Sequence, residues 1–374
     1  MISPGGFSKK TAPLIAKMKI AFRTDASSQI GTGHFMRCLT LADALKQRGA
    51  QVRFICRHLP EYLQNMLVTK EYESVLLKIR DDTVIQDDLA HSNWLGSHQH
   101  ADAQDSIHAL SDQSWDWLVV DHYALDCHWE SVLRQTASHI LVIDDIADRQ
   151  HDCDILLDQN YYADMDTRYI GKVPAHCRLF LGPQYALLRD EFRKLREKVK
   201  PRTGMGKRML VFFGGVDAEN YTGHIIEALG KLSVEAIQVA VVIGEQHPCR
   251  RKIEAACAEY KFTCHVQTDR MAELMAAADV AIGAGGSATW ERCCLGLPAL
   301  IVALANNQTE IAKGLDRLGA GRYIESQTFF NDAALHKAIR DLLQNNQQIK
   351  MLSQKAYSVV DGLGVDRLCE AMVC

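Results

Sequence analysis

The sequence predicts an α/β protein made of two doubly wound parallel sheets, each in its own domain. The chain has 374 residues, which is too long for one ordinary domain and suits two. Short apolar runs alternate with helical stretches, and most runs lack polar alternation, as strands buried on both faces should. A charged stretch followed by proline and glycine, at 188–206, separates two series of runs. Because ligands bind beyond the carboxyl ends of such strands, we expect the two domains to face a cleft that holds the site.

The apolar runs of the two series are the expected strands. In the first series these are Ile20–Phe22, Val52–Cys56, Trp117–Val120, Ile140–Ile143 and Ile155–Leu157. In the second they are Met209–Phe213, Val239–Ile243, Thr263–Val266, Val280–Ile282 and Ala299–Val302. The predicted domains are therefore 18–200 and 201–374, with allowance for the last helix to pack back on the first domain. Residues 1–17 show no period and are interpreted as a disordered leader or tag.

The composition excludes several classes of protein. Hydrophobic residues make up 47% of the chain and charged residues 24%, which is typical of a globular protein. The net charge is −4 and no basic stripe is present, so we expect no nucleic-acid partner. No apolar run approaches the roughly 20 residues of a membrane helix. The 12 cysteines form no C-x-x-C pair and follow no signal peptide, so we expect reduced thiols in a cytoplasmic protein, with no metal and no other cofactor. The sequence does not determine the oligomeric state, and we favour a monomer.

The turn after the first strand carries the candidate for catalysis. From residue 23 it reads R-T-D-A-S-S-Q-I-G-T-G-H-F-M-R, in which Gly31 and Gly33 let backbone approach a ligand closely. His34 stands in the first helical turn, where the helix dipole disfavours the imidazolium, so we expect a neutral ring that can act as a general base. Asp25 is expected to orient its other ring nitrogen, and Arg37 to pair with Asp25 or a phosphate. A structural or capping histidine and a surface arginine are the alternatives.

Two glycine-rich loops in the second half are candidates for ligand binding. Gly214 and Gly215, in F-F-G-G-V-D, end the first strand of the second series and suit either close approach of a ligand or a tight turn. Gly285, Gly286 and Ser287, in G-A-G-G-S-A-T-W-E, open a helix. Free N–H groups beside a helix N-terminus predict an anion site there.

Three polar side chains follow in the same half. Glu291 lies one turn beyond the glycine loop, and because a phosphate would repel its carboxylate we expect it to bind a pair of sugar hydroxyls. A capping carboxylate is the alternative. Asn307 and Gln308 follow the last central strand, where their amides suit hydroxyl or diphosphate recognition, or serve as turn residues.

Polar residues also follow strands of the first half. The segments D-H-Y, ending at Tyr123, and D-Q-N, ending at Asn160, both lie at strand carboxyl ends, where residues of a cleft belong. Arg189 precedes the expected hinge and can reach either domain. For each of these, an ordinary polar loop or a solvated arginine is the alternative.

Taken together, these motifs resemble one family. R-T-D-A-S-S-Q-I-G-T-G-H-x-x-R, D-H-Y, L-L-D-Q-N, L-G-P-x-Y-A-L-L-R-x-E-F, F-F-G-G-V-D and G-A-G-G-S-A-T-W-E-R-C-C-L-G-L-P are similar to the UDP-sugar hydrolases of pseudaminic acid biosynthesis (PseG type). The resemblance covers nearly the whole chain from Met18. It implies a fold like that of the MurG-type GT-B glycosyltransferases, with UDP held mainly by the second domain. It also implies the substrate UDP-2,4-diacetamido-2,4,6-trideoxy-β-L-altropyranose, hydrolysed by inverting water attack at the anomeric carbon without a metal.

The resemblance assigns roles residue by residue. It places the catalytic histidine at His34, a tyrosine near the sugar at Tyr123 and the ribose-binding glutamate at Glu291. It also matches the family's arginine to Arg189 and its amide pair to Asn307 and Gln308. The stretch Asp81–Ser114, rich in His, Asp and Gln, is longer than the family requires, and its role is left open.

Three other functions fit the same motifs. A MurG-like glycosyltransferase would pass the sugar to an acceptor hydroxyl instead of water. A non-catalytic nucleotide-sugar-binding protein would bind UDP without turnover. A UDP-N-acetylglucosamine 2-epimerase would form an epimer.

Overall fold

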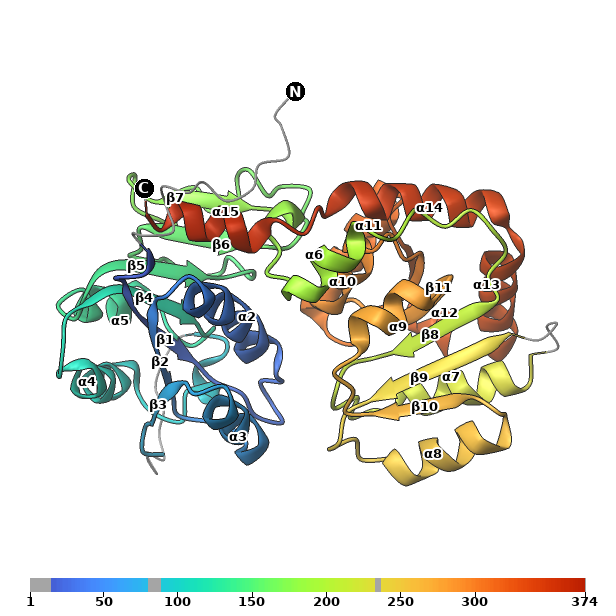
Figure 1. The fold of residues 1–374 in the computed structure, drawn as a ribbon, viewed down its shortest axis with the longest axis horizontal. Coiled ribbons are helices and arrows are strands. Elements are labelled where there is room, and N and C mark those ends of the chain that lie inside the picture. The colour runs from blue at the N-terminus through green and yellow to red at the C-terminus, as the bar shows by residue number, and fades with distance from the viewer. Residues whose placement is uncertain (1–14, 80–88, 233–236, 374) are drawn as a thin grey trace. The chain divides into compact units, whose positions relative to one another are not determined.

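The computed structural model describes residues 15–79, 89–232 and 237–373. Residues 1–14 of the expected leader and the first part of the stretch Asp81–Ser114, up to residue 88, therefore lie outside the described residues. The end of the expected leader is not disordered, because Ile15 is fully buried in a hydrophobic core. The chain divides into two compact units. Unit 1 comprises residues 1–160, 164–187 and 364–374, and unit 2 comprises 161–163 and 188–363. Each unit is an α/β layer structure whose named strands pair in parallel, which confirms the predicted fold class (Figure 1).

Unit 1 contains a seven-stranded sheet in the order β3-β2-β1-β4-β5-β6-β7. Its strands are β1 (Lys19–Thr24), β2 (Gln51–Cys56), β3 (Glu73–Leu76), β4 (Trp115–Asp121), β5 (Ala137–Ile143), β6 (Ile155–Asp158) and β7 (Arg178–Leu181). Its helices are α2 (Gly33–Gln47), α3 (Glu61–Thr69), α4 (Gln99–Leu110), α5 (Cys127–Leu133) and α15 (Gly364–Ala371), with short 3-10 turns η1 (Ser92–Trp94) and η2 (Pro183–Tyr185).

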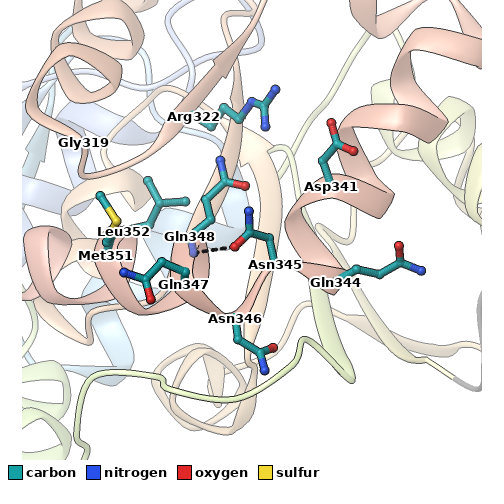
Figure 2. Close-up of a pocket in the computed structure, with 10 residues that line it drawn as sticks. All are labelled: Gly319, Arg322, Asp341, Gln344, Asn345, Asn346, Gln347, Gln348, Met351 and Leu352. Carbon is teal, nitrogen blue, oxygen red and sulfur yellow. Dashed lines mark hydrogen bonds between the residues drawn. The ribbon is translucent and has the colours of Figure 1, made fainter.

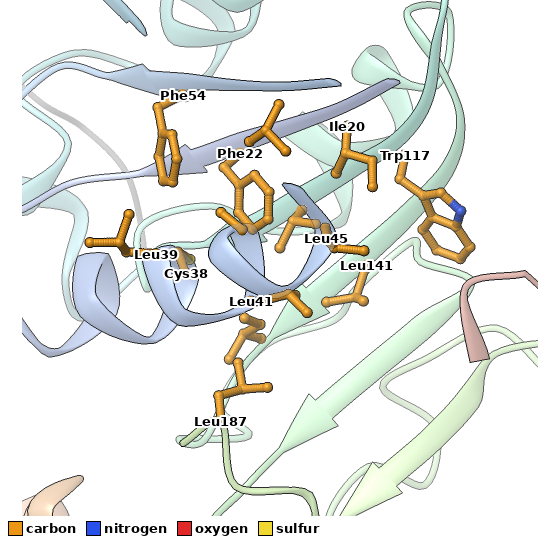
Figure 3. Packing of buried hydrophobic residues seen from close by; sticks show 14 of the residues in the cluster. Ile20, Phe22, Cys38, Leu39, Leu41, Leu45, Phe54, Trp117, Leu141 and Leu187 are labelled. Carbon is orange, nitrogen blue, oxygen red and sulfur yellow. The ribbon is translucent and has the colours of Figure 1, made fainter. Parts of the chain in front are cut away.

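Helix α2 is fixed to the sheet by the core of unit 1. Leu41 and Leu45 are fully buried on its inner face, and the stacked rings of Phe22 and Phe54, 5.1 Å apart, belong to the same cluster (Figure 3). Each such side chain contributes roughly 1.5–3 kcal/mol on burial. The start of α2, which carries His34, is thereby held at a defined place beside the sheet.

Unit 2 contains a six-stranded sheet in the order β10-β9-β8-β11-β12-β13. Its strands are β8 (Arg208–Phe212), β9 (Gln238–Ile243), β10 (Thr263–Val266), β11 (Val280–Ala284), β12 (Ala299–Val302) and β13 (Arg322–Ile324). Its helices are α6 (Asp190–Arg196), α7 (Tyr221–Gly230), α8 (Arg250–Glu259), α9 (Met271–Ala277), α10 (Ala288–Cys294), α11 (Asn306–Leu318), α12 (Ser326–Phe329), α13 (Asp332–Gln344) and α14 (Asn346–Val359).

Residues 188–200 lie in unit 2, not in the first domain as a boundary at residue 200 predicts, whereas the last helix lies in unit 1, as the prediction allowed. Helix α6 belongs to unit 2, where Arg196 donates hydrogen bonds to the carbonyls of Cys294 and Tyr357 at 2.6 and 2.8 Å. Helix α15 belongs to unit 1 and packs against α2, and Trp117 donates to the carbonyl of Met372 at 3.1 Å. Hydrogen bonds and packing with neighbours distant in sequence account for both placements.

Each of the ten predicted runs falls within a strand or extends it by one residue, but three strands were missed. The missed strands are β3, β7 and β13, and all three lie at sheet edges. Their residues are mostly partly exposed or exposed, and β7 carries the short apolar run Leu179–Leu181, from which no strand was predicted. No helix among the described residues is long and apolar enough to cross a membrane.

Candidate active site

The carboxyl end of the unit 1 sheet brings together polar residues from distant parts of the sequence. Strand order reverses between β1 and β4, which is where ligands bind in open α/β sheets. At the end of this pair Thr24 lies beside Asp121, the last residue of β4. The loop after β1 leads into α2, so His34 begins a helix at this same edge.

His34 is held by a buried carboxylate. Its Nδ1 lies 2.6 Å from Oδ1 of Asp121, whose side chain is fully buried. Arg37, one turn further along α2, donates to both oxygens of Asp121 at 2.6 and 2.7 Å. Burial acts to raise the pKa of Asp121, but Arg37 and His34 outweigh it and hold that pKa well below its usual range. Arg37 Nη2 also lies 3.2 Å from Nδ1 of His34. In the tautomer whose Nδ1–H is donated to the ionised Asp121, Nε2 is the ring nitrogen that can take a proton from water.

A second carboxylate extends this network. Asp145, two residues after β5, accepts hydrogen bonds from Arg37 at 2.8 Å and from Asn160 at 3.0 Å. The hydroxyl of Tyr123 donates to Asp145 as well. The Tyr123 ring meets the His34 ring edge to face, with centroids 4.5 Å apart. Predicted residues His34, Arg37, Tyr123 and Asn160 are thus brought together in one cluster.

The expected role of Asp25 is wrong. Its carboxylate is fully buried against Arg23 at 2.7 Å and His122 at 3.2 Å, and it accepts the backbone N–H of Arg57 at 2.7 Å. These partners occupy it, so it does not orient His34. The expected pairing of Arg37 with Asp25 is also wrong, because Arg37 donates to Asp121 and Asp145 instead; its pairing with a phosphate stays a prediction.

Sequence reasoning placed Asp121 at a strand end, in the segment D-H-Y, but gave it no role beside His34, and it missed Asp145. Both follow buried apolar runs directly, at the end of L-V-V-D and in L-V-I-D-D. An acidic residue at the carboxyl end of a central strand was the available signal. Which of these acids reaches His34 depends on the order of strands in the sheet. The local sequence does not predict that order.

The glycines of the turn before α2 lie in open surroundings. Gly31 adopts a φ of +78°, which favours glycine, and a Cβ on Gly31 or Gly33 would meet no atom within 4 Å. The backbone at this turn is therefore accessible to a ligand. Gly214, with a φ of +105°, and Gly215 in unit 2 are equally open.

The second glycine loop of unit 2 follows β11, beside the strand-order reversal between β8 and β11. The N–H of Gly285 is not free as expected, because it donates to the carbonyl of Val302 at 3.0 Å and so continues the pairing of β11 with β12. For the N–H groups of Gly286 and Ser287, the described residues offer no hydrogen-bonded acceptor. These two groups remain to bind an anion at the start of α10.

Glu291 and Arg189 meet in unit 2. Arg189 Nη2 lies 3.3 Å from a Glu291 oxygen, and its Nη1 lies 2.9 Å from Glu191. The Glu291 side chain is 19% exposed. Burial raises its pKa, and Arg189 opposes that rise. A partly exposed carboxyl group held by a single arginine retains acceptor capacity for ligand hydroxyls.

Gln308 lies beside the same glycine loop. Its Oε1 accepts the N–H of Leu304 at 3.1 Å, and its Nε2 lies 3.7 Å from where a Cβ on Gly286 would be. This leaves the amide nitrogen near Gly286 as a donor. The side chain of Asn307 lies outside the described part of the structure.

Two further features lie apart from these residues. A cavity of about 850 Å³ is lined largely by amides of the α13–α14 junction, such as Asn345 and Gln348, and by Arg322 at the start of β13 (Figure 2). None of the predicted site residues lines it, and it lies at the amino end of β13. Asp126, Cys127 and His128 are close enough together to hold a metal ion, but Asp126 caps α5 by accepting the N–H of His128 at 2.9 Å.

Comparison with known proteins supports the expected resemblance. Residues 209–363 match the model of the glycosyltransferase family 28 C-terminal domain. The chain is 26% identical over 304 residues to the UDP-2,4-diacetamido-2,4,6-trideoxy-β-L-altropyranose hydrolase of Campylobacter jejuni, covering 81% of this chain and 97% of that protein. It is 23% identical over 357 residues to the spore coat polysaccharide biosynthesis protein SpsG of Bacillus subtilis, covering 94% of this chain and 96% of that protein.

Among solved structures, MurG of Acinetobacter baumannii superposes with a TM-score of 0.63 at 16% identity, covering 95% of this chain and 99% of that chain. The resemblance to the hydrolase is thus confirmed across most of the chain, and the fold is that of the MurG-like GT-B proteins.

Proposed function

We propose that this protein hydrolyses UDP-2,4-diacetamido-2,4,6-trideoxy-β-L-altropyranose to UDP and the free sugar, as a step of pseudaminic acid biosynthesis. The observation that carries the proposal is the contact of His34 with Asp121, in a chain similar to a hydrolase of that substrate. A histidine with one nitrogen held by a carboxylate and the other left to accept a proton suits activation of water.

The proposed reaction is an inverting substitution at the anomeric carbon. Water gives a proton to His34 Nε2 as its oxygen bonds to the carbon, and the bond from that carbon to the phosphate oxygen breaks. The electron pair leaves with UDP, which is a good leaving group and needs charge stabilisation more than a proton. Asp121 stabilises the imidazolium that forms, as a carboxylate does for a general-base histidine. Inverting glycosidases use a carboxylate as the base for comparable work.

Unit 2 is proposed to bind the UDP part. The N–H groups of Gly286 and Ser287 face no acceptor among the described residues and suit the diphosphate, where they stabilise its growing charge. Gln308 adds an amide donor beside them. Glu291 is proposed to bind the ribose hydroxyls, with Arg189 holding its carboxylate in place. No step in this mechanism calls for a metal.

The test is an NMR time course of the purified protein with the nucleotide sugar alone. Appearance of UDP and the free sugar supports hydrolysis. Formation of an epimer instead indicates an epimerase, and UDP binding without turnover of this substrate indicates a binding protein.

A glycosyltransferase is the second candidate, because residues 209–363 match a glycosyltransferase family domain. It differs from the hydrolase in the acceptor that the first unit admits. A transferase given only the nucleotide sugar would leave that substrate intact, even at a high enzyme concentration. It would release UDP only after an acceptor alcohol is added.

A further inference from the structure

The segment at 89–98, within the stretch whose role the sequence left open, is anchored to unit 1. Leu95 is 1% exposed and belongs to the core beneath the sheet. Gly96 has a φ of +64°, and a Cβ there would lie 2.4 Å from Nε2 of His58, so backbone and His58 are in close contact. These two residues fix η1, which carries Trp94, at a defined position.

Anchored in this way, the segment places two aromatic rings beside the proposed catalytic residues. The Trp94 ring stacks on that of Tyr123 with centroids 5.6 Å apart, and it meets His34 edge on at 6.2 Å. The His91 ring lies 4.5 Å from Trp94 and 5.2 Å from Tyr123. His91, Trp94 and Tyr123 thus form a continuous set of rings next to His34, which we call the aromatic wall.

One polar atom of the aromatic wall lacks a partner. Nδ1 of His91 is buried, and no group in the described residues hydrogen-bonds to it. Buried polar atoms in native proteins are nearly always paired, so an orphan nitrogen beside a proposed active site points to a ligand or a water. Burial lowers the pKa of His91, which favours the neutral ring, with one nitrogen a donor and the other an acceptor.

The rings and this nitrogen suit a particular kind of sugar. Aromatic faces pack against C–H and methyl groups, whereas they leave hydroxyl groups without hydrogen bonds. A sugar bearing a 6-deoxy methyl group and acetamido groups offers methyl surface to the rings and an amide to His91. A sugar with hydroxyl groups at those positions would lose solvation there without replacement.

We propose that Trp94 and His91 determine sugar specificity, by selecting a deoxy, N-acylated hexose through apolar packing on Trp94 and an amide hydrogen bond to Nδ1 of His91. This inference rests on the proposed function, because it assumes that the sugar lies beside His34. One methyl group in such a pocket is worth about 10-fold to 200-fold in discrimination.

The experiment measures binding and turnover in Trp94→Ala, Trp94→Phe and, as a matched control from the same turn, Asn93→Ala, whose side chain is exposed. Dissociation constants for UDP and for the nucleotide sugar are taken by calorimetry in a His34→Asn background, in which turnover is slow. We expect Trp94→Ala to weaken sugar-nucleotide binding at least tenfold relative to UDP binding, Trp94→Phe to recover most of the loss, and Asn93→Ala to change neither.

A second variant tests the proposed hydrogen bond between the sugar amide and Nδ1 of His91. His91→Phe keeps a ring but removes Nδ1, and we expect it to weaken binding of the N-acetylated sugar nucleotide at least fivefold while UDP binding stays the same. If Trp94→Ala and His91→Phe leave the ratio of the two dissociation constants unchanged, the inference is overturned. Failure of the proposed function is seen separately, as absence of sugar release by the wild-type protein.

Discussion

The carboxyl ends of the two sheets can be compared directly, because β1–β6 and β8–β13 follow the same strand order. In unit 1 this edge is filled with titratable side chains that contact each other: His34, Arg37, Asp121 and Asp145. In unit 2 it carries glycines with open space around them and backbone N–H groups without acceptors in the described residues, and its acidic side chains include Glu291 and the buried Asp217, which lies 3.3 Å from His247. The same topology therefore supports a site suited to moving a proton in one unit and a site suited to binding an anion in the other.

This difference has a physical origin. A group that exchanges protons needs neighbours that set its orientation and charge, and buried carboxylates and arginines supply both at close range. A diphosphate instead needs several donors around it, which backbone N–H groups supply only where no Cβ blocks the approach. The comparison predicts that substitutions in unit 1 reduce turnover, while those in unit 2 reduce affinity for UDP.

The largest expected effect is that of His34→Asn. Without the base, kcat should fall by about 100-fold to 10,000-fold, which is the usual contribution of a general base. The dissociation constant for UDP should stay within about twofold of wild type, because the substitution leaves unit 2 intact. A time course of UDP release measures kcat, and calorimetry measures the dissociation constant for UDP. A variant with near-normal kcat would remove His34 from the mechanism.

Asp121→Asn should lower kcat by about 100-fold, because the amide no longer favours the Nδ1-protonated tautomer of His34. It should also lower the free energy of unfolding at pH 7 by about 3 kcal/mol, since Arg37 loses a buried partner. The pKa of Asp121 is depressed in the folded protein, so its stabilisation is present above the unfolded pKa of about 3.9 and is lost as the pH falls towards the folded value.

Urea unfolding of wild type and Asp121→Asn at several acidic pH values checks the direction in which the stabilisation by Asp121 changes with pH. The difference between the two proteins should shrink as the pH is lowered below 4. A difference that grows in acid would show that Asp121 is not held ionised by Arg37.

Gly286→Ala tests the anion site of unit 2. The added Cβ would lie 3.7 Å from Nε2 of Gln308, an ordinary contact, so stability should change little. The methyl group would crowd the backbone donors, and we expect UDP affinity to fall about tenfold, the loss of one hydrogen bond to a charged group. Gly204→Ala, where a Cβ also meets nothing within 4 Å, is the matched control. Equal UDP affinity in both variants would show that Gly286 does not approach the ligand.

Glu291→Gln should change the free energy of unfolding less than Asp121→Asn does, and the sign of the change should be opposite. Burial raises the pKa of Glu291, so its carboxyl group ionises at a cost in the folded protein, and stability falls as the pH rises through that pKa. The variant should therefore be more stable than wild type at neutral pH by on the order of 1 kcal/mol, with the difference disappearing in acid. A less stable variant at pH 7 would mean that the Arg189 ion pair outweighs burial.

The strands were predictable where burial on both faces of the sheet requires a run of apolar residues. Central strands such as β1 and β8 contain buried apolar runs, whereas the missed edge strands β3, β7 and β13 are partly exposed, and the short apolar run Leu179–Leu181 of β7 was overlooked. His34 was found because glycines and a strand end surround it. Its partner was assigned to Asp25, which is near in sequence, but Asp121 lies 87 residues away and reaches His34 only through the pairing of β1 with β4.

The aromatic wall could not have been predicted for the same reason. His91 and Trp94 lie in a stretch with no helical or strand period, and what places them beside Tyr123 is the anchoring of Leu95 and Gly96 in unit 1. Long-range packing of this kind leaves no local pattern.

The most direct test of water attack at the anomeric carbon is the reaction in water labelled with oxygen-18. The mass of the UDP product is then measured by mass spectrometry. Carbon–oxygen cleavage predicts that the released UDP carries no heavy oxygen, with the label entering the sugar. Heavy oxygen in the UDP would show attack at phosphorus, and would contradict the role of His34 as the base that activates water at the anomeric carbon.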